Sequence, residues 1–339
     1  MFRWPAVRAL GFVLLLPLTV SMAATACGGS SSDSLVVYSG RSESLVGSII
    51  DQFRDATGID VSVKYGKTPQ IAATLLEEGD NSPADVFFAQ DPGGLGAVVG
   101  MLSALPDDIV DLVPEWARSP QHRWVGISGR ARTVIYNRQN VSESELPQSI
   151  SDFTDTRWKG RIGWAPANAS FQAMVSTMRV TWGESRTRQW LMGIQANRPR
   201  IYPKNTPIVA AAAAGEIDVG FVNHYYLYRF IQENGEGFAA RNHYLTEGDP
   251  GALMMVAGAG ILQTARHREN AEIFLRFMLS RAAQQYFAGT TFEYPLADGV
   301  TTHRLLVPLS EVGRPTIDMT SFSDVKGTQT LLRDLGIIP

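Results

Sequence analysis

The 339-residue chain is mildly acidic, with 33 Asp and Glu against 30 Lys and Arg and a formal net charge of −3. It has no lysine- or arginine-rich block, so its electrostatics give no support to nucleic-acid binding. The length exceeds what one hydrophobic core usually holds, which predicts two lobes.

The N-terminal residues have the three-part layout of a secretory signal. Arg3 and Arg8 precede an apolar run from Ala9 to Val20, which is too short for a good membrane span, and small residues follow at 23–26. We therefore expect residues 1–26 to be a signal peptide.

Cys27 is the only cysteine of the chain and stands directly after this small-residue segment. An ordinary cut here would leave a free N-terminal thiol, but the arrangement also resembles a bacterial lipoprotein box, in which this cysteine is lipidated. The flexible Gly28–Ser32 sequence favours the lipoprotein. We expect residues 27–34 to be a lipidated cysteine and tether, which anchor an exported protein to the outer face of the cytoplasmic membrane. A lone cysteine allows no intramolecular disulfide.

From Leu35 onward, short apolar segments alternate with segments of helical spacing. The predicted strands cover 35–38, 59–63, 85–88, 131–136, 161–164, 217–222 and 254–262. The predicted helices cover 45–57, 69–78, 92–99, 171–180, 187–192, 207–214 and 271–279. This alternation predicts an α/β fold in which each lobe is a parallel, doubly wound sheet flanked by helices.

Four predicted strands end in polar or ligand-capable groups, and the carboxyl ends of parallel strands share one edge of a sheet. These ends are 40–43, 89–91, 167–170 and 223–226. Several of them open helices, whose free N–H groups favour an anion. Two lobes could bring all four ends to one cleft.

Tyr225 and Tyr226 are the most informative of these groups, because two deprotonated phenols are good ligands for a hard metal ion. On the motif alone, an aromatic helix face against the core is the more common explanation of the pair. Simpler alternatives also exist elsewhere: Asn168 and Ser170 as N-caps, Glu43 as a first-turn acid, Asn205 as a turn residue, and Arg41 and Arg132 as surface residues.

Common catalytic and nucleotide-binding motifs are missing from the sequence. It has no G-x-G-x-x-G, Walker A, H-E-x-x-H or G-x-S-x-G run, and its five histidines are scattered. No nucleophile–base pair stands out, and we expect a protein that is not an enzyme.

Residues 35 to about 305 resemble the ferric-ion substrate-binding proteins of ABC importers. The resemblance rests on the segments Val37–Arg41, Pro83–Phe88, Ser128–Arg132, Gly215–Val219, Asn223–Tyr226, Asp249–Leu253 and Glu293–Leu296, which occur in the family's order. It implies a two-lobed periplasmic-binding-protein-like fold with crossover hinge strands. Lobe 1 would be 35–131 plus 256–306, and lobe 2 would be 132–255 plus 307–339.

The resemblance also implies a ligand and partners. Tyr225 and Tyr226 fall on the positions of two phenolate ligands to Fe(III), and a companion anion such as carbonate, phosphate or citrate would complete the coordination. The family's anion-binding positions correspond to Asn168, Ala169, Ser170, Asn205 and Asn223. The partners would be an ABC permease and ATPase, the membrane through the lipid anchor, and no nucleic acid, with the protein itself a monomer.

The chain departs from the family at several ligand positions. Ser42 and Gln90 stand where many members have histidine and glutamate, and Glu43 and Phe171 stand where others have tyrosine. Glu43 is therefore a candidate third metal ligand. Arg41, Ser42, Gln90 and Asp91 are candidate groups for the anion or another ligand.

Three alternatives remain open at this point. A protein of the same fold could bind a phosphonate or another small non-metal ligand. A membrane-anchored hydrolase or transferase could use the same scaffold, and so could the sensory ectodomain of a signalling system.

Overall fold

The computed structural model describes residues 33–313 and 324–339. The predicted signal peptide, Cys27 and most of the predicted tether lie outside these residues. Within the described part of the chain, no helix has both the length and the apolar character that crossing a bilayer requires.

The strands form one continuous path of pairings in the order β2-β1-β3-β9-β4-β7-β5-β6, and β10 and β8 each pair with β4. Their bounds are β1 Ser34–Ser39, β2 Asp60–Tyr65, β3 Val86–Ala89, β4 Val125–Asn137, β5 Ile162–Trp164, β6 Arg200–Ile201, β7 Val219–Asn223, β8 Ala240–His243, β9 Met254–Ile261 and β10 Tyr294–Pro295.

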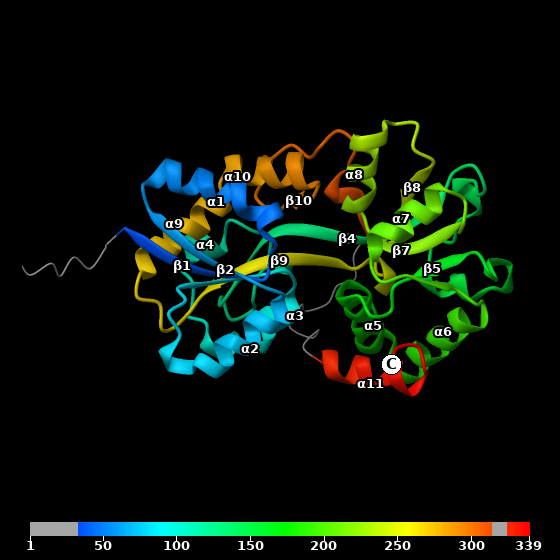
Figure 1. Cartoon of the computed structure of the whole chain (residues 1–339), viewed down its shortest axis with the longest axis horizontal. Coiled ribbons are helices and arrows are strands. Elements are labelled where there is room, and N and C mark those ends of the chain that lie inside the picture. The colour runs from blue at the N-terminus through cyan, green and yellow to red at the C-terminus, as the bar shows by residue number, and fades with distance from the viewer. Residues whose placement is uncertain (1–32, 314–323) are drawn as a thin grey trace, which may run out of the picture. The chain divides into compact units, whose positions relative to one another are not determined.

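The path consists of two segments that meet within β4. The first sheet segment comprises β2, β1, β3, β9, β10 and β4 as far as Ala131, which pairs with Met254 of β9. The second sheet segment begins at Arg132, which pairs with Asn223 of β7, and also contains β8, β5 and β6. Figure 1 shows β4 and β9 running between the two groups of elements.

The prediction of parallel sheets is confirmed only in part. β1 pairs in parallel with β2 and β3, and β5 with β6 and β7, but β9 is antiparallel to β3 and β4, and β4 is antiparallel to β7. β4 and β9 are the strands that cross between the segments, and neither is the second strand of a compact strand–helix–strand unit. The right-handed parallel crossover therefore does not apply to them.

β4 begins six residues before the predicted strand, and all 13 of its residues are buried. Gly126, Ser128 and Gly129 look like turn residues in the sequence, which hid this first half. A Cβ at Gly126 would lie 2.8 Å from the Ala117 carbonyl oxygen and 2.8 Å from Leu296. Glycine is used there because neighbouring backbone approaches closely.

The helices cover both faces of each sheet segment. In Figure 1, α1, α9 and α10 lie on one side of the first segment and α2 and α3 on the other, while α7 and α8 lie opposite α5, α6 and α11 in the second. Their bounds are α1 Glu43–Thr57, α2 Thr68–Glu78, α3 Pro92–Ala97, α4 Asp107–Val110, α5 Ala169–Trp182, α6 Glu184–Ala196, α7 Asn205–Ala213, α8 Tyr225–Asn234, α9 Arg268–Met278, α10 Arg281–Tyr286 and α11 Val325–Asp334.

The predicted helices are confirmed, with ends that shift by a few residues. α1 shows why the pattern was readable: Val46, Ile49, Ile50 and Phe53 form its buried face, and Gly58 ends it with φ of 73° in the left-handed region. The predicted site residues lie at the carboxyl ends of β1, β3, β5 and β7, and a helix follows each of these ends.

Candidate metal centre

The tyrosine pair begins α8, immediately after β7. Asn223 is the last residue of β7, His224 is the N-cap, and Tyr225 and Tyr226 are the first helical residues. Tyr225 is 3% exposed and Tyr226 is partly exposed, and their ring centroids are 4.4 Å apart. The pair therefore presents two adjacent phenols at the end of a buried strand, as the sequence predicted.

The environment of Tyr226 keeps its phenol protonated when no metal is present. Burial raises the pKa of Tyr226, and the neighbouring Tyr225 raises it further, while a hydrogen bond with Asn205 and the charge of Arg130 act in the opposite direction. A cation that binds here must displace this proton. A highly charged ion can do so, because its own field stabilises the phenolate.

His224 holds the start of α8 in place and is not free to bind a metal. Its Nδ1 accepts the N–H of Ala131 at 3.1 Å, and its Nε2 donates to the Phe292 carbonyl at 2.8 Å. Burial lowers the pKa of His224 to about 4, so the ring is neutral at pH 7. Both ring nitrogens are used for hydrogen bonds that tie β7 to β4 and to the segment before β10.

Arg132 joins the asparagines of the second sheet segment into one cluster. Its Nη1 donates to Asn223 Oδ1 at 3.0 Å and to Asn205 Oδ1 at 3.4 Å. Asn223 Nδ2 donates in turn to Ser170 Oγ at 3.1 Å, and Asn205 Nδ2 lies 3.5 Å from Asn168 Oδ1. The structure thus brings together four of the five residues predicted to bind the companion anion.

The fifth, Ala169, is the first residue of α5, directly beside this cluster. Asn168 caps the helix by accepting the Ser170 N–H at 3.0 Å, which confirms the expected N-cap role without excluding ligand binding. A cavity of about 260 Å³ is lined by Ala169 and Gln172 of α5 and by Asp91 and Pro92 at the start of α3. Asp91 and the α5 terminus therefore face a common space.

Arg132 is a buried cation with no carboxylate partner among the described residues. It is 1% exposed, and burial lowers its pKa to about 9, while the neighbouring Tyr226 and Tyr225 raise it. Its Nε and Nη2 atoms have no hydrogen-bond partner among the described residues. Buried donors of this kind are rare in folded proteins and call for a specific explanation.

A second cluster lies at the carboxyl ends of β1 and β3. Arg41 Nη2 contacts both carboxylate oxygens of Glu293, at 2.9 and 3.0 Å, and Arg41 Nη1 donates to Gln90 Oε1 at 3.0 Å. Arg130 Nη2 donates to the Gln90 carbonyl, and Ser128 Oγ donates to Glu293. Gln90, which stands where many relatives of the resembled family have a ligand glutamate, is therefore held by an arginine.

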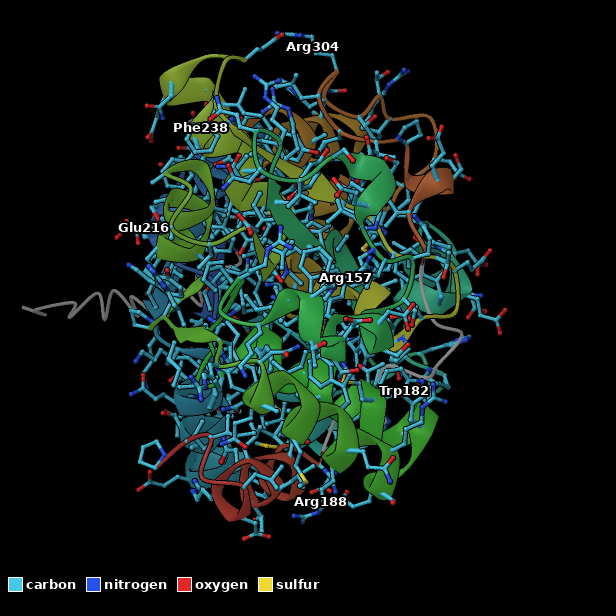
Figure 2. The ribbon with its side chains drawn as sticks, turned by 90° about the vertical axis from the view of Figure 1, so that its right-hand side faces the viewer. Arg157, Trp182, Arg188, Glu216, Phe238 and Arg304 are labelled. Carbon is cyan, nitrogen blue, oxygen red and sulfur yellow. The ribbon has the colours of Figure 1, made fainter. Side chains whose placement is uncertain are left out.

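The possibility that Arg41 and Arg132 are ordinary surface residues is wrong. Arg41 is 0% exposed, and both guanidinium groups lie inside hydrogen-bonded clusters. The sequence hid this because an arginine is seldom buried without a partner, and the partner of Arg41 is 252 residues away. For contrast, Figure 2 labels Arg188 and Arg304, which lie at the exposed surface.

Ser42 and Glu43 lie at the exposed start of α1. Ser42 Oγ is 3.1 Å from Ser44 Oγ. Burial raises the pKa of Tyr65, the last residue of β2, and the charge of Glu43 raises it further. Among the described residues, no interaction joins Glu43 to the tyrosine pair. Its role as a third metal ligand stays a prediction.

Glu293 and Arg130 belong to the site region but received no role from the sequence. Glu293 follows a π-helical turn at Phe287–Thr291 and Phe292, which has φ of 56°. A non-glycine residue in this region marks local strain, and such strain is concentrated at functional sites. Arg130 and Arg132 lie two residues apart and therefore on one face of a strand, and this spacing is the sequence signal that could have identified the two arginines.

No group of three or more His, Cys, Asp or Glu side chains suited to a metal occurs among residues 33–313 and 324–339. A site built on carboxylates or imidazoles is therefore not formed in this part of the chain. The ligand-capable groups that do converge are phenols, amides and guanidinium groups.

Comparisons with known proteins agree on the class of protein. Residues 81–308 match the family described as bacterial extracellular solute-binding proteins. The chain is 31% identical to the Fe(3+)-binding periplasmic protein of Serratia marcescens, over 98% of this chain and 99% of that protein.

Solved structures with the same fold include two that contain iron. Iron-bound HitA from Pseudomonas aeruginosa superposes with a TM-score of 0.83 at 32% identity, covering 89% of this chain and 99% of that one. The Trichodesmium protein IdiA (FutA), in complex with iron and citrate, superposes with a TM-score of 0.81 at 28% identity, covering 90% and 100%. The predicted two-lobed α/β fold is confirmed.

Proposed function

Because the chain belongs to the family of bacterial extracellular solute-binding proteins, we propose that it captures Fe(III) together with a companion anion and delivers it to an ABC permease. The observation that carries this proposal is the pair of adjacent phenols, Tyr225 and Tyr226, at a buried strand end beside a cluster of anion-binding groups. Relatives named for ferric iron binding support it.

The two phenols would bind the ion as phenolates. Each phenol has an ordinary pKa near 10, and burial raises that of Tyr226 further, so the charge of the ion must drive deprotonation. Two phenolates leave further coordination positions open on the ion. A companion anion would fill some of them, with Glu43 as a further candidate.

The anion would be held by the groups that converge on Arg132. Asn168, Ala169 and Ser170 at the start of α5, together with Asn205 and Asn223, offer amide, hydroxyl and backbone N–H donors. The N-terminus of this 14-residue helix adds a positive potential that favours an anion. Arg41, Ser42, Gln90 and Asp91 would face it from the first sheet segment.

The proposal includes an export route and a division into lobes. A signal peptide at 1–26 and lipidation of Cys27 would anchor the protein to the outer face of the cytoplasmic membrane. Lobe 1 would comprise 35–131 plus 256–306, and lobe 2 would comprise 132–255 plus 307–339. The change of partner of β4 between Ala131 and Arg132 supports this division.

The proposal is tested by visible spectroscopy of purified protein loaded with ferric citrate. Phenolate coordination to Fe(III) should give a charge-transfer band, and Tyr225→Phe and Tyr226→Phe should each weaken and shift it. Tyr228→Phe is the matched control, because Tyr228 is a buried phenol of the same helix whose hydroxyl lies 3.4 Å from that of Tyr244. Absence of colour, or a band that both tyrosine variants leave unchanged, would refute the assignment.

A further inference from the structure

We infer that Ser34 is an activated nucleophile, with His267 as its general base and Asp85 as the residue that orients this base. The reagent that it accepts is an acyl ester with a good leaving group. The inference goes beyond the proposed function and does not depend on it, because these three residues, called the Ser34 triad below, lie away from the tyrosine pair.

The side chains of the Ser34 triad form one chain of hydrogen bonds. Ser34 Oγ lies 3.1 Å from His267 Nε2, and His267 Nδ1 lies 3.0 Å from Asp85 Oδ2. A serine within hydrogen-bond distance of a base that a third group orients is the arrangement that activates a hydroxyl for attack. The sequence hid this arrangement because Ser34 and His267 are 233 residues apart.

Asp85 fixes the orientation and the tautomer of the His267 ring. It is 0% exposed, and its Oδ1 accepts the backbone N–H groups of Arg266 and His267 at 2.8 and 2.9 Å. Its Oδ2 accepts the Val36 N–H at 2.8 Å and faces Nδ1 of the ring. A carboxylate in this position accepts a hydrogen bond from Nδ1–H, which leaves the lone pair of Nε2 for the Ser34 hydroxyl. General base catalysis by the ring requires this tautomer.

Ser34 is held beside the ring by β1 and α9. It is the first residue of β1, and His267 is the N-cap of α9. Asn270 of α9 donates from Nδ2 to the Ser34 carbonyl at 2.9 Å. Ser34 is half-buried, and the His267 side chain is 26% exposed. The nucleophile and its base are therefore positioned together where the ring is partly open to solvent.

The Ser34 triad lies at the edge of the first sheet segment opposite to the predicted site. Ser34 begins β1 and Asp85 directly precedes β3, whereas Arg41 and Gln90 follow the carboxyl ends of these strands. Ser34 and Ser39 are the two ends of the six-residue β1, roughly 16 Å apart. In Figure 1, β1 and α9 lie away from α8, which begins with the tyrosine pair. The triad is therefore separate from the candidate metal centre.

The expected reaction transfers one acyl group to the protein. Ser34 Oγ attacks the carbonyl carbon of the ester while His267 Nε2 takes the hydroxyl proton. The tetrahedral intermediate expels the alcohol or phenol part of the ester as its anion, which receives the proton from Nε2, and Ser34 then carries the acyl group as a new ester. General base catalysis typically contributes about 10²–10⁴-fold, which suits an ester with a good leaving group rather than an amide.

The test follows acetylation of the purified protein by p-nitrophenyl acetate, with each modified serine located by peptide mass spectrometry. Ser44 is the internal control, because it is exposed and its Oγ contacts another serine hydroxyl, that of Ser42. Ser34 should be acetylated at least about 100-fold faster than Ser44. Ser34→Ala should lose this fast reaction.

His267→Gln removes the base and should slow acetylation of Ser34 by about 100-fold or more. The matched control is His122→Gln, which should leave the rate unchanged. His122 is also a histidine beside a carboxylate, with Nδ1 3.6 Å from Asp107 and a side chain that is 44% exposed.

A second measurement needs no substitution and covers the case in which His267→Gln does not fold. In the wild type, the acetylation rate of Ser34 should rise from pH 5 and level off above about pH 8, because a histidine base loses its proton in this range. The rate at Ser44 should instead keep rising with the hydroxide concentration. Among the described contacts, Asp85 is the charged group that faces the ring.

The inference is overturned if Ser34 reacts no faster than Ser44, if His267→Gln leaves the rate at Ser34 unchanged, or if that rate does not level off with pH. The hydrogen bonds of the triad would then serve only to tie β1 and the start of β3 to α9. None of these results bears on ferric loading, which the tyrosine variants test separately.

Discussion

Replacing Glu293 by methionine should strongly destabilise the protein, because it leaves Arg41 as a buried charge without a partner. Both side chains are 0% exposed, and Arg41 Nη2 contacts the two carboxylate oxygens at 2.9 and 3.0 Å. Burial alone would raise the pKa of Glu293, but the charges of Arg41 and Arg130 and the hydrogen bond from Ser128 lower it, so the carboxylate is ionised at pH 7.

The expected loss of stability follows from the unpaired charge of Arg41 that the substitution leaves in the interior. Removing one partner of a buried ion pair typically costs about 3–5 kcal/mol, whereas removing both and filling the space with apolar groups costs far less. Glu293→Met should therefore lower the free energy of unfolding by about 3–5 kcal/mol. The double variant Arg41→Met/Glu293→Met should be more stable than Glu293→Met alone.

Urea unfolding of the metal-free protein at pH 7 measures these differences, and an exposed ion pair supplies the control. Asp108 contacts Arg276 at 2.7 Å, but the two side chains are 61% and 39% exposed, so Asp108→Asn should change the free energy of unfolding very little. The reasoning is refuted if Glu293→Met costs no more than Asp108→Asn. It is also refuted if the double variant loses as much stability as the sum of the losses measured for Arg41→Met and Glu293→Met.

Two further predictions concern stability. Burial lowers the pKa of His224 to about 4, whereas the ring has a pKa of about 6.5 in the unfolded chain. The neutral ring therefore contributes its full stabilisation of the fold above pH 6.5, and about 3 kcal/mol of stability is lost as the pH falls to 4. Urea unfolding of metal-free wild type and His224→Gln between pH 4 and 7 checks this, and profiles of equal slope would contradict it. Asp85→Asn should cost about 2–3 kcal/mol in thermal unfolding, because the buried carboxylate accepts hydrogen bonds from the backbone of Val36, Arg266 and His267; a loss as small as that of the exposed Asp51→Asn would show that these bonds matter little.

The sequence predicted most helices and strands because their buried faces recur at regular spacing. α1 is readable from four buried residues and a glycine that ends it, and β7 from a short apolar run before Asn223. The prediction that polar strand ends converge also holds within the second sheet segment, where Asn168, Ser170, Asn205 and Asn223 are linked through hydrogen bonds.

Long-range partners could not be predicted in this way. Nothing local to Arg41 points to Glu293, and nothing local to Arg132 identifies its partners Asn205 and Asn223. The first half of β4 was missed because its glycines serve close packing rather than a turn. The antiparallel direction of β4 and β9 depends on how the chain crosses between the sheet segments, which local periodicity does not encode.

β4 connects the ligand-binding groups to the angle between the two sheet segments. Arg130 and Arg132 lie two residues apart on one face of this strand, yet Arg130 bonds to Gln90 of the first sheet segment and Arg132 to Asn223 of the second. Any change in the angle between the segments must turn one guanidinium relative to the other. If an anion favours one angle between the sheet segments, a variant that favours the same angle must bind that anion more tightly, because the two equilibria are coupled. Substitutions far from the cleft that stiffen or bend β4 should therefore retune ligand binding without touching the ligand.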